Sequence, residues 1–365
     1  MLAAAHRRGE EVLVIAPESM RLQVADAGLS FVPGAEPPER EVARIREQLP
    51  LAPPAQAIVL GNRELFGRLA ARAMLPAMQD AMRIWRPDLL IREPCEYASA
   101  AVAVSDCVPT AQVAISVADG ELASIEAAAP ALEELRPGLT KRLISTPYLT
   151  RFPASLDPSP FPATVRFREP DRAPRPLPDW WPGVGGPLIY LTFGTVFGYL
   201  SGAGGAYRTV LQAVSGLPVR VLLTVGRRFD PVALGVLPAN VHVEPWVEQT
   251  DALAAADLVL CHGGSGTTFG ALAAGLPLIV LPAFADQNVN GRRIAAAGAG
   301  ITIEAGPEGG ERRGRLVDDS DIPRIIAAIT AALTRPSYRS TAAKIAQEMK
   351  AAALIDDVLG ALLLD

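Results

Sequence analysis

Short apolar runs alternate with longer amphipathic stretches along most of the chain. The runs have the length of buried strands, and the stretches between them repeat their apolar residues at helical spacing. The predicted strands are 11–16, 29–32, 89–91, 110–115, 164–167, 188–193, 220–225, 241–243, 258–261, 278–281 and 300–303. Strands that alternate with helices in this way indicate parallel sheets covered by helices, as in doubly wound α/β proteins.

A proline-rich interval interrupts the alternation near the middle of the chain. Residues 169–187, EPDRAPRPLPDWWPGVGGP, contain too many prolines for a helix or a central strand. We interpret this interval as a linker between a domain at 1–168 and a domain at 188–365. A long helical pattern closes the chain, and we expect its end to pack back on the N-terminal domain. Residues 33–54, rich in proline and charge, are predicted to form a surface loop.

Composition narrows the classes of function. The 365 residues carry a net charge of −5, so the chain lacks the basic surface typical of nucleic-acid-binding proteins. Its three cysteines are dispersed without metal-type spacing, which favours reduced thiols. No run is long and apolar enough to span a bilayer, and no secretory pattern is present. These features predict a cytoplasmic protein.

The segment with the most informative chemistry is 257–290, DLVLCHGGSGTTFGALAAGLPLIVLPAFADQNVN. A predicted strand ends at His262 and is followed by a glycine-rich turn and a helix. The first backbone N–H groups of a helix are unpaired, and glycines let an anion approach them closely. The turn therefore predicts a phosphate site, although a plain tight turn has the same pattern. Its residues are His262, Gly263, Gly264, Ser265, Gly266, Thr267 and Thr268.

Other polar residues follow neighbouring strands. Asp286 and Gln287 come after 278–281, and Thr195 comes after 188–193. Trp246 and Gln249 come after 241–243. Because the carboxyl ends of parallel strands meet at one edge of the sheet, we expect these residues to converge on one ligand site.

The order of these residues resembles a known signature. Trp246, Gln249, His262-Gly263-Gly264, Thr267-Thr268, Gly275-Leu276-Pro277 and Asp286-Gln287 are similar to the donor-binding signature of nucleotide-sugar-dependent glycosyltransferases of GT-B fold. The resemblance is strongest to bacterial enzymes that glycosylate antibiotics, of macrolide and enediyne type, and other natural products. It implies two Rossmann-like doubly wound domains facing a central cleft.

The resemblance also implies an activity. The expected reaction is an inverting transfer, of hexosyltransferase type, from a dTDP- or UDP-sugar to a hydroxyl of a small hydrophobic acceptor. The nucleotide sugar is a co-substrate, and neither a cofactor nor a metal is expected. Two alternatives stay open: a nucleotide-sugar-binding protein inactive in transfer, and a GT-B fold nucleotide-sugar epimerase. The sequence leaves a homodimer open.

In the family, matching residues have distinct roles. By resemblance, Trp246 stacks on the nucleotide base, although core packing is its alternative role. His262 and the turn at 266–268 hold the phosphates, with Thr195 approaching from another side. Asp286 and Gln287 bind sugar hydroxyls. Gly270 stands where many plant relatives have a ribose-binding glutamate, which favours a dTDP-sugar.

The catalytic base is the unassigned part of this interpretation. In the family, a strand and a Gly-His loop precede the helix and strand that resemble residues 1–17, and the loop histidine is the base. We expect this first strand and its histidine to be missing. His6 lies at a predicted helix end rather than at a strand tip. Glu93 and Glu96 follow the strand 89–91 and are candidates for the base, although they also suit the start of a helix.

Overall fold

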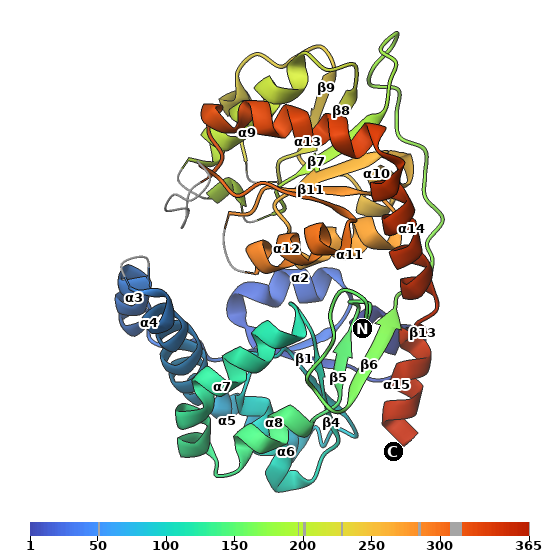
Figure 1. The fold of residues 1–365 in the computed structure, drawn as a ribbon. Helices are drawn as coiled ribbons and strands as arrows, with labels where there is room; N and C mark the ends of the chain where they lie inside the picture. Colours follow the sequence, from blue (N-terminus) through green and yellow to red (C-terminus); the bar gives the residue numbers. More distant parts are fainter. Residues whose placement is uncertain are drawn as a thin grey trace. The chain divides into compact units, whose positions relative to one another are not determined.

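The computed structural model describes residues 1–49, 52–195, 197–199, 202–227, 229–283, 286–306 and 316–364. The chain divides into two compact units (Figure 1). The first consists of Met1–Arg151, Pro158–Pro170 and Ala352–Asp365, and the second of Phe152–Asp157 and Asp171–Ala351. Every described strand pair is parallel. The predicted α/β fold class is confirmed.

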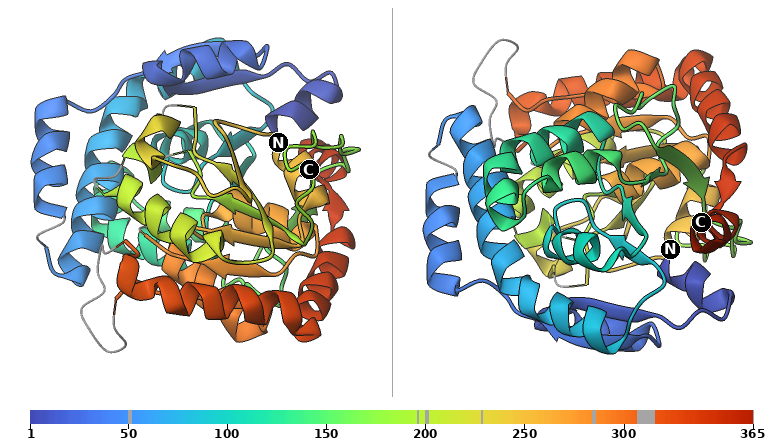
Figure 2. Two further views of the ribbon diagram at one scale, coloured as in Figure 1. Left: turned by 90° about the horizontal axis from the view of Figure 1, so that it is seen from above. Right: turned by 90° about the horizontal axis from the view of Figure 1, so that it is seen from below.

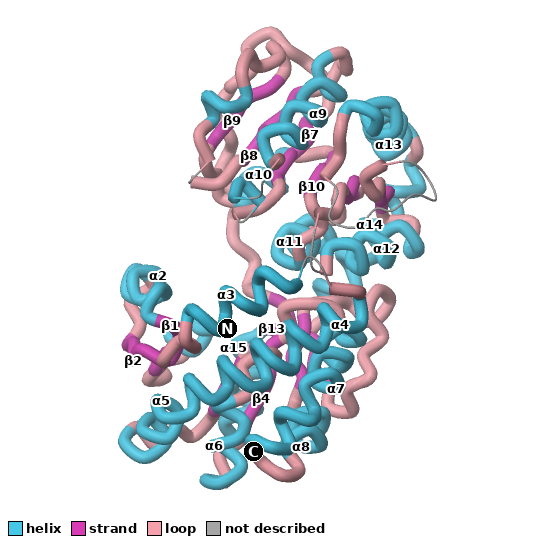
Figure 3. Tube along the Cα trace, turned by 90° about the vertical axis from the view of Figure 1, so that its left-hand side faces the viewer, coloured by secondary structure: helices cyan, strands magenta, loops and turns pink. Residues whose placement is uncertain are grey.

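The first unit contains two sheets. The five-stranded sheet has the order β13-β6-β5-β4-β3, and the two-stranded sheet pairs β1 with β2. The bounds are β1 Leu13–Pro17, β2 Ser30–Gly34, β3 Leu90–Arg92, β4 Thr110–Val113, β5 Tyr148–Thr150, β6 Thr164–Arg168 and β13 Ala353–Leu354. In the described residues β1 pairs with β2 and not with the larger sheet, and Figure 3 shows β1 and β2 apart from β4 of that sheet. Strands β1 and β3 are therefore both edge strands.

Helices cover these strands. They are α1 Leu2–Arg7, α2 Arg21–Asp26, α3 Glu39–Gln48, α4 Pro54–Ile58, a π-helical segment Val59–Ala70, α5 Ala71–Ile84, α6 Ala98–Asp106, α7 Ala118–Leu135, α8 Leu139–Ser145 and α15 Ile355–Leu364. The N- and C-terminal helices α1 and α15 lie side by side in both views of Figure 2. Arg7 donates to both carboxylate oxygens of Asp356, at 3.2 and 2.8 Å.

Helix α3 corrects the prediction of a surface loop at 33–54. Its apolar residues Val42 and Ile45 lie on one buried face, while its charged residues face solvent. The prolines that suggested a loop lie on both sides of the helix in the sequence, and Glu39 and Glu41 lie in its first turn, where carboxylates interact favourably with the helix dipole. Six of the ten residues of α3 are charged, and this polar composition hid the amphipathic pattern.

The second unit is a six-stranded sheet with the order β12-β11-β10-β7-β8-β9. The strands are β7 Leu188–Thr192, β8 Arg220–Thr224, β9 Val241–Glu244, β10 Leu258–Cys261, β11 Leu278–Val280 and β12 Gly300–Thr302. Its helices are α9 Ala203–Ser215, α10 Gln249–Ala255, α11 Ser265–Ala273, α12 Gln287–Ala297, α13 Ile322–Thr334 and α14 Pro336–Lys350.

Both faces of this sheet are buried. Ile189 and Leu191 of β7 belong to a core cluster with α9 and α13, whereas Leu188 and Tyr190 belong to a cluster with α11 and α14. Successive residues of a strand point to opposite faces, so a sheet covered on both faces needs a continuous apolar run. This explains why the strands of the second unit could be located from the sequence.

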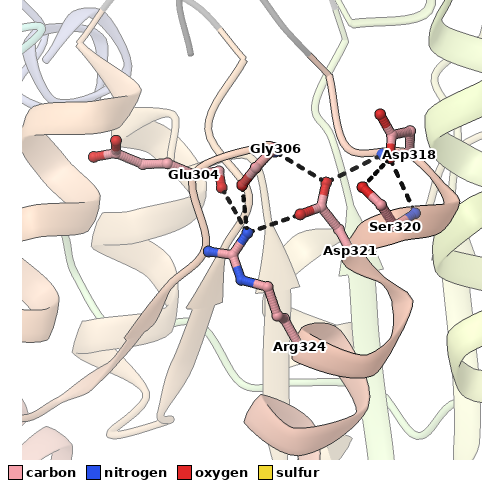
Figure 4. A network of polar contacts seen from close by, with 6 residues as sticks. All are labelled: Glu304, Gly306, Asp318, Ser320, Asp321 and Arg324. Carbon is pink, nitrogen blue, oxygen red and sulfur yellow. Dashed lines mark hydrogen bonds and ion pairs between the residues drawn. The ribbon is translucent and has the colours of Figure 1, made fainter. Parts of the chain in front are cut away.

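A polar network joins β12 to the start of α13 (Figure 4). Arg324 Nη1 donates to the carbonyl oxygens of Glu304 and Gly306 at 3.1 and 3.0 Å, and to Asp321 Oδ1 at 2.8 Å. Asp321 is buried and also accepts from the backbone N–H of Asp318. The buried carboxylate is therefore both paired and hydrogen-bonded, as burial of a charge requires.

Among the helices of the described segments, none is both long enough and apolar enough to cross a membrane.

Candidate functional site

The candidate site lies at the carboxyl ends of β7 and β10. Strand β7 pairs with β8 on one side and with β10 on the other, so the strand order reverses between β7 and β10. In doubly wound proteins the loops that follow two such strands diverge and leave a ligand crevice. Here these loops are Gly194-Thr195 and the turn that begins at His262.

Glycines on both sides make room for the His262 ring. A Cβ atom on Gly264 would overlap the imidazole, and one on Gly194 would lie 3.0 Å from His262 Nε2. Gly194 also has φ +73°, which strains any residue with a side chain. The two loops therefore enclose the His262 ring. This explains why positions 194 and 264 are both glycine, since a side chain at either position would collide with the ring.

The His262 imidazole is neutral over the ordinary pH range. Burial lowers its pKa to about 4, and the Asp286 carboxylate and a backbone hydrogen bond with Thr192 only partly oppose this effect. Its Nδ1 is buried without a hydrogen-bond partner among the described residues. A neutral imidazole has a single N–H, so the ring can donate to an anion as well as to the Thr192 backbone only in the protonated form, which an arriving anion would favour.

The N-terminus of α11 is open to a ligand. In the described structure no side chain caps it, and the first intrahelical bond comes from Thr268 N, which donates to Gly264 O at 3.0 Å. The backbone N–H groups of 265–267 therefore have no helical acceptor. Gly266 has open space where a Cβ would stand. An anion could approach the first turn of this nine-residue helix.

Asp286 is held beside this helix by two donors. Its Oδ2 accepts from Ser265 Oγ at 2.8 Å and from Asn290 Nδ2 at 3.1 Å. Asn290 also donates to Gly263 O at 2.9 Å, and it is only 1 % exposed. Sequence reasoning missed Asn290, although its position one helical turn after Asp286 was a signal. The Asn290 amide ties the glycine turn to the acidic residue.

The Gln249 side chain occupies the space that a side chain at position 270 would need. Its Nε2 donates to Thr267 Oγ1 at 3.5 Å, and a Cβ on Gly270 would lie 2.8 Å from Gln249 Oε1. A larger residue at position 270 would therefore displace Gln249. Thr268, the next hydroxyl of the turn, is buried, and its Oγ1 has no partner in the described structure.

Gln287 supports the loop after β11. It is 3 % exposed, and its Oε1 accepts from Ala283 N at 2.9 Å. Residues 284 and 285, between these groups, lie outside the described residues. The contact places Gln287 beneath the loop that carries Asp286.

Trp246 and Thr195 are accessible at the same end of the sheet. Trp246 follows β9 and is 46 % exposed, so it is not a core residue. The Arg227 guanidinium lies 4.9 Å from the centre of the Trp246 ring. Thr195 is exposed and lies beside Gly226, where a Cβ would be 3.7 Å from Thr195 Cα. The loops after β7, β8 and β9 thus lie next to one another at the carboxyl end of the sheet.

In the first unit, the two candidate carboxylates have different surroundings. Glu96 Oε1 accepts from the backbone N–H groups of Ala98 and Ser99 at 2.8 and 3.2 Å, so it caps α6. Glu93 Oε2 accepts from Cys95 N at 3.0 Å, and burial raises the pKa of the Glu93 carboxyl group. The helix-start role that the sequence left open therefore applies to Glu96.

Sequence reasoning did not single out Glu121, a buried carboxyl group in the first turn of α7. It is 4 % exposed, and its Oε1 accepts from Ile115 N and Ser116 N at 2.8 and 2.7 Å. Burial raises its pKa to about 7 against the lowering effect of these donors. The folded state therefore holds a proton here that the unfolded chain releases near pH 4.5.

Glu121→Gln is expected to change how stability depends on pH. The raised pKa contributes stability that is present below about pH 4.5 and is lost as pH rises through 7. At pH 8 the variant should be more stable than the parent by up to about 3 kcal/mol, since each pKa unit corresponds to about 1.4 kcal/mol. Urea unfolding from pH 5 to 8 measures this. Glu126→Gln, an exposed position of the same helix, is the control. Parallel pH profiles for Glu121→Gln and the parent would contradict the expectation.

No group of three or more His, Cys, Asp or Glu residues in the described parts of the chain is arranged to hold a metal ion.

Comparisons with known proteins agree with the fold. The family model "Erythromycin biosynthesis protein CIII-like, N-terminal domain" matches residues 3–182, and the model of its C-terminal domain matches 208–363. The elloramycin glycosyltransferase ElmGT of Streptomyces olivaceus is 30 % identical over 370 residues, which cover 96 % of this chain and 88 % of that protein.

Solved structures show the same architecture. The glycosyltransferase SnogD from Streptomyces nogalater is 25 % identical with a TM-score of 0.72, over 99 % of this chain and 93 % of that chain. The spinosyn rhamnosyltransferase SpnG, complexed with thymidine diphosphate, has a TM-score of 0.73 at 22 % identity, over 99 % and 94 % of the two chains. These are GT-B glycosyltransferases, which confirms the predicted fold and resemblance. The chain belongs to the erythromycin biosynthesis protein CIII-like family of antibiotic-biosynthesis glycosyltransferases.

Proposed function

We propose that the second unit binds a dTDP-sugar and that the protein transfers the sugar, with inversion, to a hydroxyl of a small hydrophobic natural product. One observation carries the proposal. A neutral imidazole and an uncapped helix N-terminus lie at the reversal point of the sheet, beside a carboxylate held by Ser265 and Asn290.

The diphosphate would occupy the N-terminus of α11. Backbone N–H groups of 265–267 would donate to its oxygens, and His262 would add a side-chain donor. The loop containing Thr195 would approach from β7. These groups stabilise the charge that grows on the diphosphate as it leaves, which is electrostatic catalysis by fixed donors.

The sugar and the base would lie on either side of the diphosphate. Asp286 uses Oδ2 for protein contacts, and its other oxygen can accept from a sugar hydroxyl. Trp246 would stack on the base. Gly270 has no side chain to bind a ribose hydroxyl, and Gln249 fills the space beside it, which supports a deoxyribose nucleotide. SpnG, of the same fold, is complexed with thymidine diphosphate.

In the proposed reaction the acceptor oxygen forms a bond to the anomeric carbon. The bond from that carbon to the diphosphate oxygen breaks, and its electron pair leaves with dTDP. The hydroxyl proton passes to a general base. Of the two sequence candidates, Glu93 is the better one, because Glu96 is engaged in capping α6.

Melting temperatures with dTDP, UDP, ADP and pyrophosphate test the donor site. A ligand at 100 times its Kd stabilises the folded state by about 2.7 kcal/mol. For a unit of this size we expect dTDP to raise the melting temperature by roughly 5–10 °C. A larger shift with UDP would correct the nucleotide, and no shift with any nucleotide would reject the site. NMR of the product formed from an α-linked dTDP-sugar then tests inversion, because a retained anomeric configuration would contradict it.

A further inference from the structure

The proline-rich linker is docked on the second unit over part of its length. Residues 171–181 belong to that unit, although they form neither a helix nor a strand. Trp181 is 6 % exposed in an apolar cluster that includes residues of α10, and Trp180 packs against the same cluster. Every second residue from 174 to 178 is a proline, which stiffens this part of the linker. A segment that only connects two units needs length alone, whereas this one is both stiff and docked.

Two arginines of the linker pair with carboxylates at the start of α10. Arg172 Nη1 lies 2.9 Å from Glu248 Oε2. Arg175 donates twice to Asp251, from its backbone N to Oδ1 at 2.8 Å and from Nε to Oδ2 at 3.2 Å. Because Asp251 is only 6 % exposed, its carboxylate depends on these donors more than a surface carboxylate would.

A stacked pair of rings holds the linker at β9. Trp180 of the linker lies on the imidazole of His242, with ring centroids 4.3 Å apart and ring planes 10° apart. The His242 Nε2 atom is 2.8 Å from Glu244 Oε1, which fixes the orientation of the imidazole. Trp181 meets the same imidazole edge-on, with centroids 6.1 Å apart. Ring contacts of both kinds are favourable beyond the burial of the rings.

These contacts lie on both sides of one loop. The loop 245–248 carries Trp246 and joins β9 to α10. Trp180 holds the strand before the loop, while Arg172 and Arg175 hold the last loop residue and the first turn of α10. Since nearly half of the Trp246 surface is exposed, the position of this ring depends on the backbone of the loop. The linker therefore fixes the part of the chain that sets where Trp246 lies.

We propose that the docked linker positions Trp246 for the base of the donor nucleotide. Its positioning residues are Arg172, Arg175 and Trp180. The inference rests on the proposed function, in which Trp246 stacks on the base. Because the linker holds both ends of the loop, less conformational freedom is lost when the base binds. The coupling is reciprocal, so a base bound to Trp246 stabilises the docked linker by the same free energy.

Calorimetric titration of linker variants with dTDP tests the proposal. Trp180→Ala removes the ring that stacks on His242 and is expected to weaken dTDP binding about tenfold. Trp180→Phe keeps a ring there and should bind within about twofold of the parent. Arg172→Ala should weaken binding about threefold. Its matched control is Arg335→Ala, at an exposed position between α13 and α14, which should bind as the parent does.

The outcomes separate this inference from the proposed function. Thermal melting first shows that each variant is folded. If the parent binds dTDP and both Trp180→Ala and Arg172→Ala bind it equally well, the positioning role of the linker is overturned and the donor site stands. If the parent itself does not bind dTDP, the proposed function is rejected and the inference falls with it.

Hydrogen exchange measured by NMR gives the reciprocal test. The Arg175 amide donates to the Asp251 carboxylate, so its exchange reports opening of the docked linker. Saturating dTDP should slow this exchange at least about fivefold in the parent, and less than about twofold in Trp246→Ala, which lacks the ring. A contact with only a structural role would not respond to the nucleotide. Equal slowing in the two proteins, or no slowing in a parent that binds dTDP, would overturn the proposal.

Discussion

His262→Ala is expected to lower kcat for sugar transfer by about 10²–10³-fold, the usual effect of removing one fixed donor to a developing negative charge. The ring sits between the loops after β7 and β10, where both Gly194 and Gly264 leave room for it. It is neutral when free, since burial lowers its pKa to about 4, and it would contact the diphosphate as a hydrogen-bond donor. Steady-state kinetics with saturating dTDP-sugar measures the change.

His6→Ala is the matched control, because His6 is exposed on α1 in the other unit. Its kcat should equal that of the parent. If His262→Ala retains kcat within about twofold while its melting temperature is unchanged, the imidazole does not stabilise the leaving group, and its role is structural.

Asn290→Asp is expected to reduce the free energy of unfolding at pH 8 by about 3 kcal/mol. In the parent, the Asn290 amide donates hydrogen bonds to Asp286 Oδ2 and Gly263 O, and the substitution replaces this donor with a buried carboxylate. The new side chain cannot donate to either group when ionised, and it repels the Asp286 carboxylate. Urea unfolding at pH 8 measures the loss. The glycine turn should move as well, so KM for the dTDP-sugar is expected to rise.

Asn288→Asp, at a less buried position of the same helix, is the control and should change stability by less than about 0.5 kcal/mol. Equal losses for the two variants would indicate a general effect of charge on α12. They would contradict the role assigned to Asn290 as the residue that holds Asp286 and the turn together.

The sequence predicted the candidate site because the residues of that site follow strand ends. His262, Asp286 and Thr195 each come directly after an apolar run or close to one, and the carboxyl-end rule needs no knowledge of long-range contacts. The packing of the His262 ring against Gly194 could not be predicted without such contacts, because these residues are far apart in the chain. The need for a glycine at position 270 could not be predicted either, because it depends on where the Gln249 side chain lies.

Asn290 and α3 escaped prediction for different reasons. A polar residue inside a helix usually faces solvent, and only the contacts of Asn290 with Gly263 and Asp286 identify it as a buried one. The apolar stripe of α3 is narrow, and its charges dominated the local composition.

The most direct test of the central claim, that the turn at His262 binds the diphosphate of the donor, is NMR titration of the imidazole groups with and without dTDP. The chain has three histidines, and the His262→Ala variant assigns the signal. The account predicts that free His262 stays neutral down to about pH 4, and that dTDP shifts its signal and raises its pKa. A dTDP titration that leaves the His262 signal and its pKa unchanged would contradict the account.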